Sequence, residues 1–128
     1  MILPTYLITG ANRGIGLELV RQLKNRGEDV IATCRSTSSE LNSLSVRVET
    51  GVDITSGDSV VKLRENLNDT KVDVLIQNAG IAEFNSLSNF DPQSILNQFE
   101  VNALSPLCFV QAMLSHLSQS AKIALISS

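Results

Sequence analysis

A glycine-rich stretch near the amino terminus has the clearest chemical meaning in the chain. Residues 9–16 read Thr-Gly-Ala-Asn-Arg-Gly-Ile-Gly, which gives a Gly-x3-Gly-x-Gly spacing. Gly10 permits a turn that a side chain would obstruct, Gly14 lets the backbone approach a ligand, and Gly16 allows a helix to pack closely. The spacing is neither Gly-x-Gly-x-x-Gly nor a phosphate loop with its Lys and Ser or Thr. It predicts a pyrophosphate bound at free helix N–H groups, and a tight turn without a ligand is the alternative.

The elements around these glycines alternate between strand and helix patterns. Residues 5–9 form a short apolar run, and Ile15, Leu19 and Leu23 then recur at helical spacing up to Gly27. Further strands are expected at 29–34, 46–53, 72–78 and 122–126, and further helices at 38–44, 56–69 and 91–120. Pro106 lies inside the last helical region and predicts a kink or a break there.

The order of these elements predicts the architecture. Five strands alternating with helices imply right-handed crossovers and a parallel sheet with helices on both faces. The fold class is therefore α/β, a doubly wound sheet of the Rossmann type, of which the sequence contains the first five strands. At 128 residues the chain has the size of one ordinary domain.

Composition excludes several classes of function. The net charge of −3 comes from 10 basic and 13 acidic residues scattered along the chain, which argues against nucleic acid or an anionic membrane as partner. Cys34 and Cys108 have no metal-ligand spacing and no second pair, so no metal site is expected and a reducing, cytoplasmic compartment fits best. No stretch resembles a signal peptide or reaches membrane-spanning length, and a soluble protein is predicted.

The glycine stretch and the Asn-Ala-Gly sequence at 78–80 together resemble the short-chain dehydrogenase/reductase family. The resemblance covers the whole chain in the expected order. Residues 7–27, LITGANRGIGLELVRQLKNRG, and residues 30–36, VIATCRS, are most similar to its C-factor and sniffer-type carbonyl reductase branch.

The end of the second strand favours NADP(H) as the cofactor. NAD-binding folds usually place an acid there for the ribose 2′-hydroxyl, whereas this chain has Cys34 and Arg35. Arg13 adds a second guanidinium that could reach a 2′-phosphate, and Ser36 could donate a hydroxyl. Charge-assisted hydrogen bonds of this kind contribute roughly 1.5–3 kcal/mol each. The alternative is that Arg35 is a solvated loop residue and that Arg13 faces water.

Further cofactor-binding roles follow from the resemblance alone. It implies that Asp53 accepts a hydrogen bond from the adenine amino group with Ile54 beside the ring, although Asp53 could instead brace a turn or cap a helix. It implies that the 78–80 segment lines the cofactor ribose, although the family more often has Asn in place of Gln77. The complete set implied for the cofactor is Gly10, Asn12, Arg13, Gly14, Ile15, Gly16, Arg35, Ser36, Asp53, Ile54, Asn78, Ala79, Gly80 and Val101.

The resemblance also implies two catalytic residues. Ser128 matches the Ser that hydrogen-bonds the substrate carbonyl, and Asn102 matches the helix Asn that helps hold a water in the proton relay. An Asn in an apolar helical run could equally be a satisfied core group. The family's Tyr-x-x-x-Lys pair occurs nowhere, because Tyr6 is the single Tyr and Gly10 follows it four positions later. These 128 residues are therefore predicted to be inactive alone.

Two other side chains are weaker candidates for catalysis. His116 reads as a surface or capping residue near a helix end. Cys34 has two Arg neighbours that could make it a reactive thiolate, but it reads better as a small residue at the cofactor rim.

The residues around the carboxyl terminus shape the overall hypothesis. The strand at 122–126 would have an uncovered edge, and Leu104, Phe109, Met113 and Leu117 would lack later elements to pack against. We therefore expect a single NADP-binding domain over 1–128 that ends before the Tyr-x-x-x-Lys helix of a protein about twice as long. The expected function is hydride transfer between NADP(H) and a small carbonyl or alcohol substrate, with a homo-oligomer as the full-length form. The alternative is a non-catalytic short protein that binds a nucleotide or a partner and associates through its open sheet edge.

Overall fold

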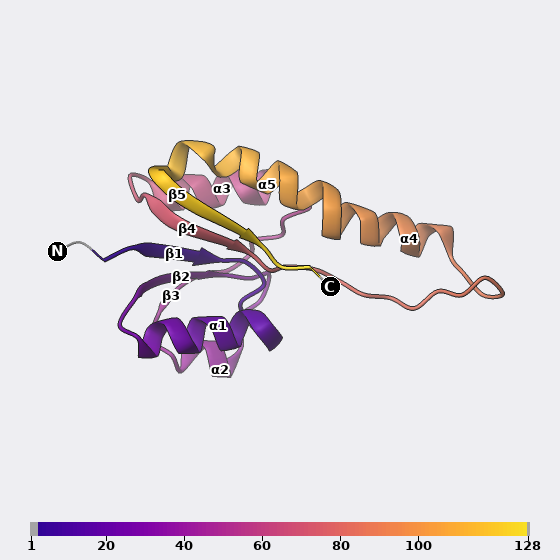
Figure 1. Cartoon of the computed structure of the whole chain (residues 1–128), viewed down its shortest axis with the longest axis horizontal. Coiled ribbons are helices and arrows are strands. Elements are labelled where there is room, and N and C mark those ends of the chain that lie inside the picture. The colour runs from indigo at the N-terminus through magenta and orange to yellow at the C-terminus, as the bar shows by residue number, and fades with distance from the viewer. Residues whose placement is uncertain (1–2, 128) are drawn as a thin grey trace.

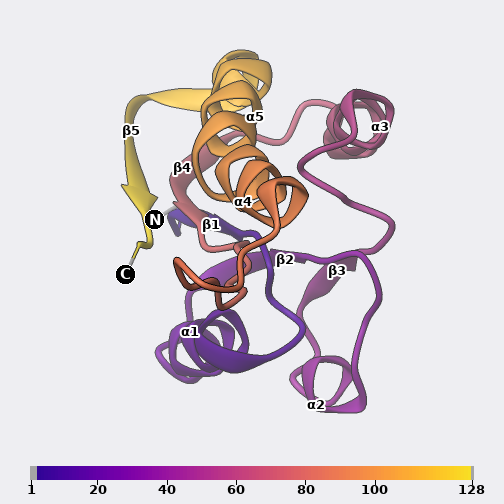
Figure 2. The same cartoon turned by 90° about the vertical axis from the view of Figure 1, so that its right-hand side faces the viewer.

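A five-stranded parallel sheet forms the centre of the computed structural model, which describes residues 3–127. The elements are β1 (Thr5–Ile8), α1 (Gly14–Asn25), β2 (Asp29–Thr33), α2 (Ser39–Asn42), β3 (Arg47–Glu49), α3 (Gly57–Leu67), β4 (Val72–Gln77), α4 (Pro92–Phe99), a π-helical turn (Glu100–Leu104), α5 (Ser105–Met113), a 3₁₀ turn (Leu114–His116) and β5 (Leu117–Leu125). The strands lie in the order β3-β2-β1-β4-β5. Helices α1 and α2 lie on one face, and α3 and α5 lie on the other (Figures 1 and 2). The predicted doubly wound α/β fold is confirmed.

The apolar strands bury both of their faces, as the unbroken hydrophobic runs require. On the α3 and α5 side, Leu7 and Leu75 pack in one cluster with Phe109 and Met113. On the α1 and α2 side, neighbouring strand residues pack in a second cluster, which contains Ile8, Val20, Leu23, Val30, Ala32, Leu41 and Ile76. Two separate cores therefore hold the sheet between its helical layers.

The strand order reverses between β1 and β4. The chain runs outward from β1 through β2 to β3, and then returns through α3 to place β4 beside β1. The connections after β1 and β4 consequently diverge to opposite faces, which leaves a crevice outside their carboxyl ends. The site described below occupies this crevice.

Of the two outcomes predicted at Pro106, a kink or a break, the structure excludes the break. The chain does not break there, because α4 continues into α5 through the π-helical turn 100–104. Ser105 N–H donates to the Glu100 carbonyl, five residues back. A proline removes one helical hydrogen bond and crowds the preceding turn, and the wider π turn accommodates it without a break.

The helix expected over 91–120 is also shorter in the structure than predicted. The helix ends at Met113, and residues 117–120, expected to be helical, belong to β5. Leu117 pairs with Val72 of β4 and packs against the core, so sheet pairing overrides the helical spacing of Leu114 and Leu117. A register shift follows, because the next pair joins Val74 to Lys122. Strand β3 is also shorter than expected, since it ends before Gly51, whose φ is +71°.

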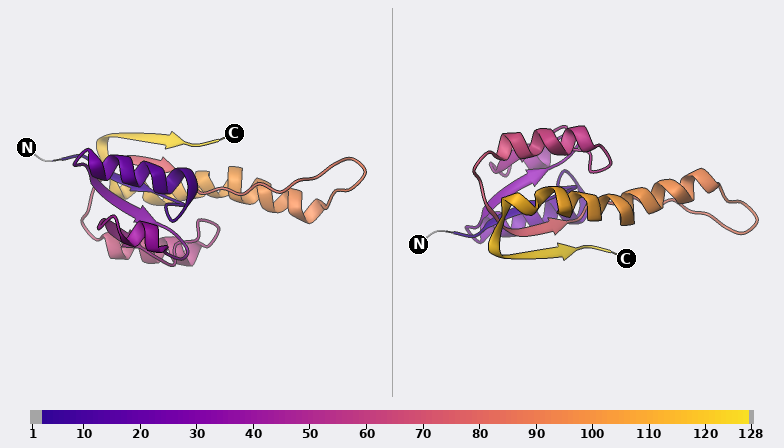
Figure 3. Two further views of the ribbon diagram at one scale, coloured as in Figure 1. Left: turned by 90° about the horizontal axis from the view of Figure 1, so that it is seen from below. Right: turned by 90° about the horizontal axis from the view of Figure 1, so that it is seen from above.

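The segment between β4 and α4 projects beyond the sheet (Figure 3). Around it and along α4, α5 and β5 lie many exposed apolar side chains, among them Phe84, Leu87, Phe99, Leu104, Leu107, Leu125 and Ile126. The expected uncovered patch is thus only partly right. Leu104 is exposed, but Phe109 and Met113 are buried in the core beneath α3 and α5.

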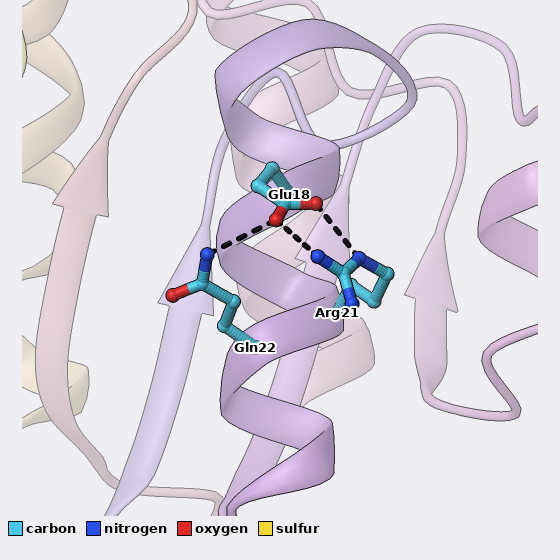
Figure 4. Close-up of polar contacts among 3 residues, drawn as sticks. All are labelled: Glu18, Arg21 and Gln22. Atoms are coloured by element: carbon cyan, nitrogen blue, oxygen red, sulfur yellow. Dashed lines mark hydrogen bonds and ion pairs between the residues drawn. The ribbon is translucent and has the colours of Figure 1, made fainter.

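The solvent face of α1 has a small polar cluster (Figure 4). The Glu18 carboxylate accepts hydrogen bonds from the Arg21 guanidinium and from the Gln22 amide, the latter at 3.0 Å. These bonds, with Arg21 as the largest cause, lower the pKa of Glu18 to about 2. The three residues are one helical turn apart and support the helix locally.

Candidate nucleotide site

Each glycine of the 9–16 stretch is required by a different local geometry. Gly10 and Gly14 have φ values of +62° and +58°, in the left-handed region that favours glycine. A Cβ on Gly16 would lie 2.2 Å from the Gly10 carbonyl oxygen, whereas one on Gly14 would meet nothing within 4 Å. Gly16 therefore lets the helix pack on the turn, and Gly14 leaves open space above it.

The amino end of α1 lacks the side-chain cap found on α2, α3 and α4. Its N-cap residue, Arg13, makes no side-chain capping bond, and the first turn contains no acid. Helix α3 is capped by Ser56 and helix α4 by Asp91. The first N–H groups of α1 thus remain available to an external acceptor, and the helix dipole favours a negative one. This end of α1 could hold a phosphate group.

A hollow of about 350 Å³ opens in front of this helix end at the carboxyl edge of the sheet. Twelve of the fourteen predicted cofactor residues line it: Gly10, Asn12, Arg13, Gly14, Ile15, Arg35, Asp53, Ile54, Asn78, Ala79, Gly80 and Val101. Gly16 lies behind the turn, and Ser36 is an exposed residue outside the lining. The stretches that sequence places far apart therefore surround one space.

Five residues that line the hollow were not predicted from the sequence: Thr9, Thr33, Val52, Thr55 and Ile81. Thr9 directly follows β1, and Thr33 ends β2. Ligands of open α/β sheets bind outside the carboxyl ends of the strands, so the residues that end each predicted strand were the available signal.

Asp53 braces a turn and also faces the hollow. Its carboxylate accepts hydrogen bonds from the Thr55 hydroxyl at 2.7 Å and the Thr55 backbone N–H at 2.9 Å. These two bonds, helped by the positive charge of Arg35, lower the pKa of Asp53. The carboxylate is therefore ionised near neutral pH and can accept a further hydrogen bond from a ligand.

Cys34 lines the hollow, and its backbone is hydrogen-bonded to Glu49 and Val52. Its side chain is buried, and burial raises the pKa of its thiol. A reactive thiolate is disfavoured by this environment. Cys34 therefore fits the reading as a small rim residue.

Asn102 contacts the loop after β4 from the π-helical turn. Its Oδ1 accepts from Ile81 N–H at 2.9 Å, and its Nδ2 donates to the Ile81 carbonyl at 2.7 Å. The residue is exposed, so it is not the buried core group that was the alternative. The π turn thus presents Asn102 to the backbone beside Gly80.

A second, larger hollow of about 1170 Å³ continues from the first. The two share Arg13, Ile15 and the segment 78–81. Much of the remaining wall is apolar: Pro106, Leu107 and Val110 come from α5, Ile123 and Leu125 come from β5, and Ile126 directly follows β5. The shared wall places an apolar space beside the polar, anion-favouring one.

The other predicted residues lie away from both hollows or outside the described part. Ser128 lies outside the described residues, and Ser127 lines the second hollow. Tyr6 lies within β1, as predicted. His116 Nδ1 lies 3.2 Å from the Thr70 carbonyl, in the turn before β5.

The described residues contain neither a metal-binding group of side chains nor a membrane-spanning helix. Among residues 3–127, no three His, Cys, Asp or Glu side chains form a group that could hold a metal ion. In the same part of the chain, no helix combines the length and hydrophobicity needed to cross a membrane.

The fold and the site define a class of protein. A doubly wound parallel sheet with a glycine turn, an uncapped helix end and a hollow at its switch point is a dinucleotide-binding α/β domain. The family model for short chain dehydrogenases matches residues 4–128. The chain belongs to the short-chain dehydrogenase/reductase family, and the resemblance seen in the sequence is confirmed.

Individual relatives agree with this assignment. The 1-hydroxy-2-glutathionyl-2-methyl-3-butene dehydrogenase of Rhodococcus sp. strain AD45 is 36% identical over an alignment of 128 positions, which covers 98% of this chain and 57% of that protein. A carbonyl reductase of Pseudomonas aeruginosa PAO1, solved in complex with NADP, has a TM-score of 0.90 at 30% identity and covers 98% of this chain and 61% of that one.

A sniffer-type protein is also similar. The Caenorhabditis elegans protein described as carbonyl reductase Sniffer has a TM-score of 0.83 at 29% identity, covering 100% of this chain and 65% of that one. The chain thus spans between 57% and 65% of the length of these three proteins.

Proposed function

We propose that this chain is the NADP(H)-binding domain of an oxidoreductase that acts on a carbonyl or alcohol substrate. The observation that carries the proposal is the uncapped, acid-free end of α1, which opens behind the glycine turn onto a hollow at the switch point. A pyrophosphate there would accept from N–H groups that nothing else in the described residues caps through a side chain. The whole of residues 1–128 forms this one domain.

Arg35 and Arg13 would hold the 2′-phosphate. Both side chains line the first hollow, both are exposed, and neither forms an ion pair with another residue in 3–127. Ser36 follows Arg35 directly and would add a hydroxyl donor from outside the present lining. Their positive charge supports NADP(H) over NAD(H), because a 2′-hydroxyl offers no charge to pair with.

The rest of the nucleotide would follow the lining. Asp53 would accept from the adenine amino group, with Ile54 against the ring and Val101 on the opposite helix. Asn12 would line the ribose at the adenine end, and the segment 78–80, which lines both hollows, would line the ribose nearer the second hollow. The ionised state of Asp53 supports this role, since a carboxylate accepts hydrogen bonds and cannot donate them.

Bound NADP(H) would supply a hydride to a carbonyl carbon or accept one from an alcohol carbon. The reacting group would lie in the second hollow, much of whose wall is apolar. Ser128 would hydrogen-bond the substrate oxygen. Asn102 retains one amide hydrogen and one lone pair beyond its bonds to Ile81, and these would hold a water in the proton relay.

The 128 residues alone should bind nucleotide without reducing a substrate. The sequence contains no Tyr-x-x-x-Lys pair, so no acid with a lowered pKa is available to protonate the substrate oxygen. The two free cysteines support a cytoplasmic location. We expect the active form to be a homo-oligomer.

Titration of the chain with NADPH and NADH tests the proposal. We expect NADPH to bind, and NADH to bind about tenfold to a hundredfold more weakly because it lacks the 2′-phosphate. Calorimetry gives both affinities, and a carbonyl substrate added afterwards should cause no NADPH oxidation. If NADPH does not bind, the proposed cofactor is wrong. Measurable turnover would show that another acid in this chain protonates the substrate oxygen.

The second candidate is a non-catalytic protein that associates through β5. That strand pairs with β4 on one side, and Leu125 and Ile126 beside its end are exposed. An exposed apolar edge strand favours pairing with another chain. Sedimentation of the nucleotide-free chain distinguishes the two, because a stable dimer that persists without nucleotide and a lack of NADPH binding would favour this candidate.

A further inference from the structure

Gln77 ends β4 between the two hollows, and its side chain is 2% exposed. Its Oε1 accepts from the Thr9 hydroxyl at 2.9 Å, and its Nε2 donates to the Ala79 carbonyl at 3.2 Å. Its backbone carbonyl accepts from Ile126 N–H at 3.0 Å. One buried residue therefore touches β1, the end of β5 and the segment that lines both hollows.

The Thr9 hydroxyl fixes the direction of these bonds. It accepts from Asn78 N–H at 2.9 Å and from Ala79 N–H at 3.1 Å. A hydroxyl has one hydrogen and two lone pairs, so with both lone pairs occupied it must donate to Gln77. Reversing the Gln77 amide would set its oxygen against the Ala79 carbonyl and ask Thr9 to accept three times. The observed orientation satisfies every group.

We infer that Gln77 is a positioning residue of the nucleotide site, which holds the segment 78–80 through Thr9 and through the Ala79 carbonyl. The inference rests on the proposed function, because it concerns how that nucleotide is held. The Asn78 side chain extends the same arrangement by donating to the Gly10 carbonyl at 3.2 Å. The glycine turn and the segment 78–80 are thus joined as one wall of the first hollow.

The length of the Gln77 side chain is part of this role. The family more often has Asn here, and Asn is shorter by one methylene. With the backbone in place, the shorter side chain should lengthen its contact to the Thr9 hydroxyl, to the Ala79 carbonyl or to both. Gln77→Asn should therefore lose one of the two bonds and give part of the effect of removing the amide.

Two ligands separate positioning from general stability. NADPH would occupy the whole cavity, whereas adenosine 2′,5′-bisphosphate would occupy only the end near Arg35, Asp53 and Ile54. In Gln77→Met, which keeps the length but removes the amide, we expect NADPH to bind about tenfold more weakly. The affinity for adenosine 2′,5′-bisphosphate should change by less than about twofold.

Variants of Thr9 and Thr5 provide a second test of the inference and its control. Thr9→Val should lose NADPH affinity as Gln77→Met does, and Thr9→Ser, which keeps the hydroxyl, should restore most of it. Thr5→Val removes a comparable side-chain bond, from Thr5 Oγ1 to Asp29 at 2.8 Å, at the opposite end of the same strand. It should lower the urea midpoint without changing the affinity for either ligand.

The outcomes are distinct. If the unaltered chain fails to bind NADPH, the proposed function is wrong and this inference falls with it. If the unaltered chain binds and Gln77→Met binds equally well, this inference alone is wrong. An equal loss for both ligands, or a loss in Thr5→Val as large as in Thr9→Val, would also overturn it, because the effect would then be a general loss of structure. The milder Gln77→Asn and Thr9→Ser keep the test open if a stronger variant fails to fold.

Discussion

The two ends of the sheet differ in whether their polar groups are bonded within the protein or left available to a ligand. At the amino end, Asp73 accepts from Thr5 N–H at 2.8 Å, and Asp29 accepts from the Thr5 hydroxyl at 2.8 Å. At the carboxyl end, the first N–H groups of α1 have no side-chain cap, and Arg35 is exposed over a hollow. The amino end satisfies its groups internally, whereas the carboxyl end leaves donors and positive charge for a ligand. Stability and binding are therefore separated along the same strands.

This difference teaches how to read a polar residue next to a strand. Thr5 begins β1 and Thr9 directly follows its last residue, and the two have the same side-chain chemistry. Thr5 links two strands and lines neither of the two hollows described above, while Thr9 lines the first. Substitutions at the carboxyl end should mainly change nucleotide affinity, and substitutions at the amino end should mainly change stability.

The largest effect is expected from Gly16→Ala. The new methyl group would lie 2.2 Å from the Gly10 carbonyl oxygen, so the glycine turn or α1 must move. Overpacking of this kind costs about 1–3 kcal/mol, and displacement of the helix end should also abolish measurable NADPH binding. Calorimetry and urea unfolding measure the two effects. The matched control is Gly57→Ala at the start of α3, where a Cβ meets nothing within 4 Å and both properties should be retained.

The next largest effect is expected from Arg35→Ala. Removing one guanidinium from the 2′-phosphate should weaken NADPH binding about tenfold to a hundredfold and leave NADH binding unchanged. Parallel titrations with the two nucleotides measure this selectivity. Arg47→Ala on β3, whose guanidinium bonds the Asn66 carbonyl, is the control and should not alter it. An equal loss for both nucleotides would show that Arg35 does not read the 2′ position.

A smaller effect, on stability alone, is expected from Asp73→Asn. Bonds from Thr5 N–H and the Ser118 hydroxyl lower the folded-state pKa of Asp73 below its ordinary value of 3.8. The ionised carboxylate therefore stabilises the fold above about that pH, and the contribution is lost as the pH falls through the lowered pKa. Urea unfolding should show the variant less stable at neutral pH and converging with the unaltered chain in acid. A change in NADPH affinity in this variant would contradict the assignment of stability to the amino end and binding to the carboxyl end of the strands.

The smallest effect is expected from Glu18→Gln on the solvent face of α1. The cluster with Arg21 and Gln22 is fully exposed, so solvent screens its charges and we expect no measurable change in stability or affinity. NMR titration of the Glu18 carboxyl should nevertheless give a pKa of about 2. An ordinary value would show that the cluster does not persist in solution.

Local patterns in the sequence predicted the sheet and the glycine turn, and the family resemblance supplied much of the rest of the lining. Continuous apolar runs such as 72–77 identify buried strands, and the glycine spacing at 9–16 identifies the turn. The start of β5 could not be predicted, since residues 118–120 are polar and Leu117 joins the sheet only through its pairing with Val72 of β4. The role of Thr9 was hidden for a similar reason, because its partners at 77–79 are nearly 70 positions away.

The π-helical turn at 100–104 gives the chain a sensitivity to length that substitutions do not reveal. Each residue of an α-helix advances the chain by about 100° around its axis. The single additional residue in this turn therefore sets the phase between α4 and α5, and with it the direction in which Asn102 meets Ile81. Deleting one residue here would leave a more regular helix, but it would rotate α4 and Phe99 to another side of the molecule. The rotation of α4 relative to α5 and the nucleotide site therefore depends on the number of residues in the π-helical turn and not on any single side chain in it.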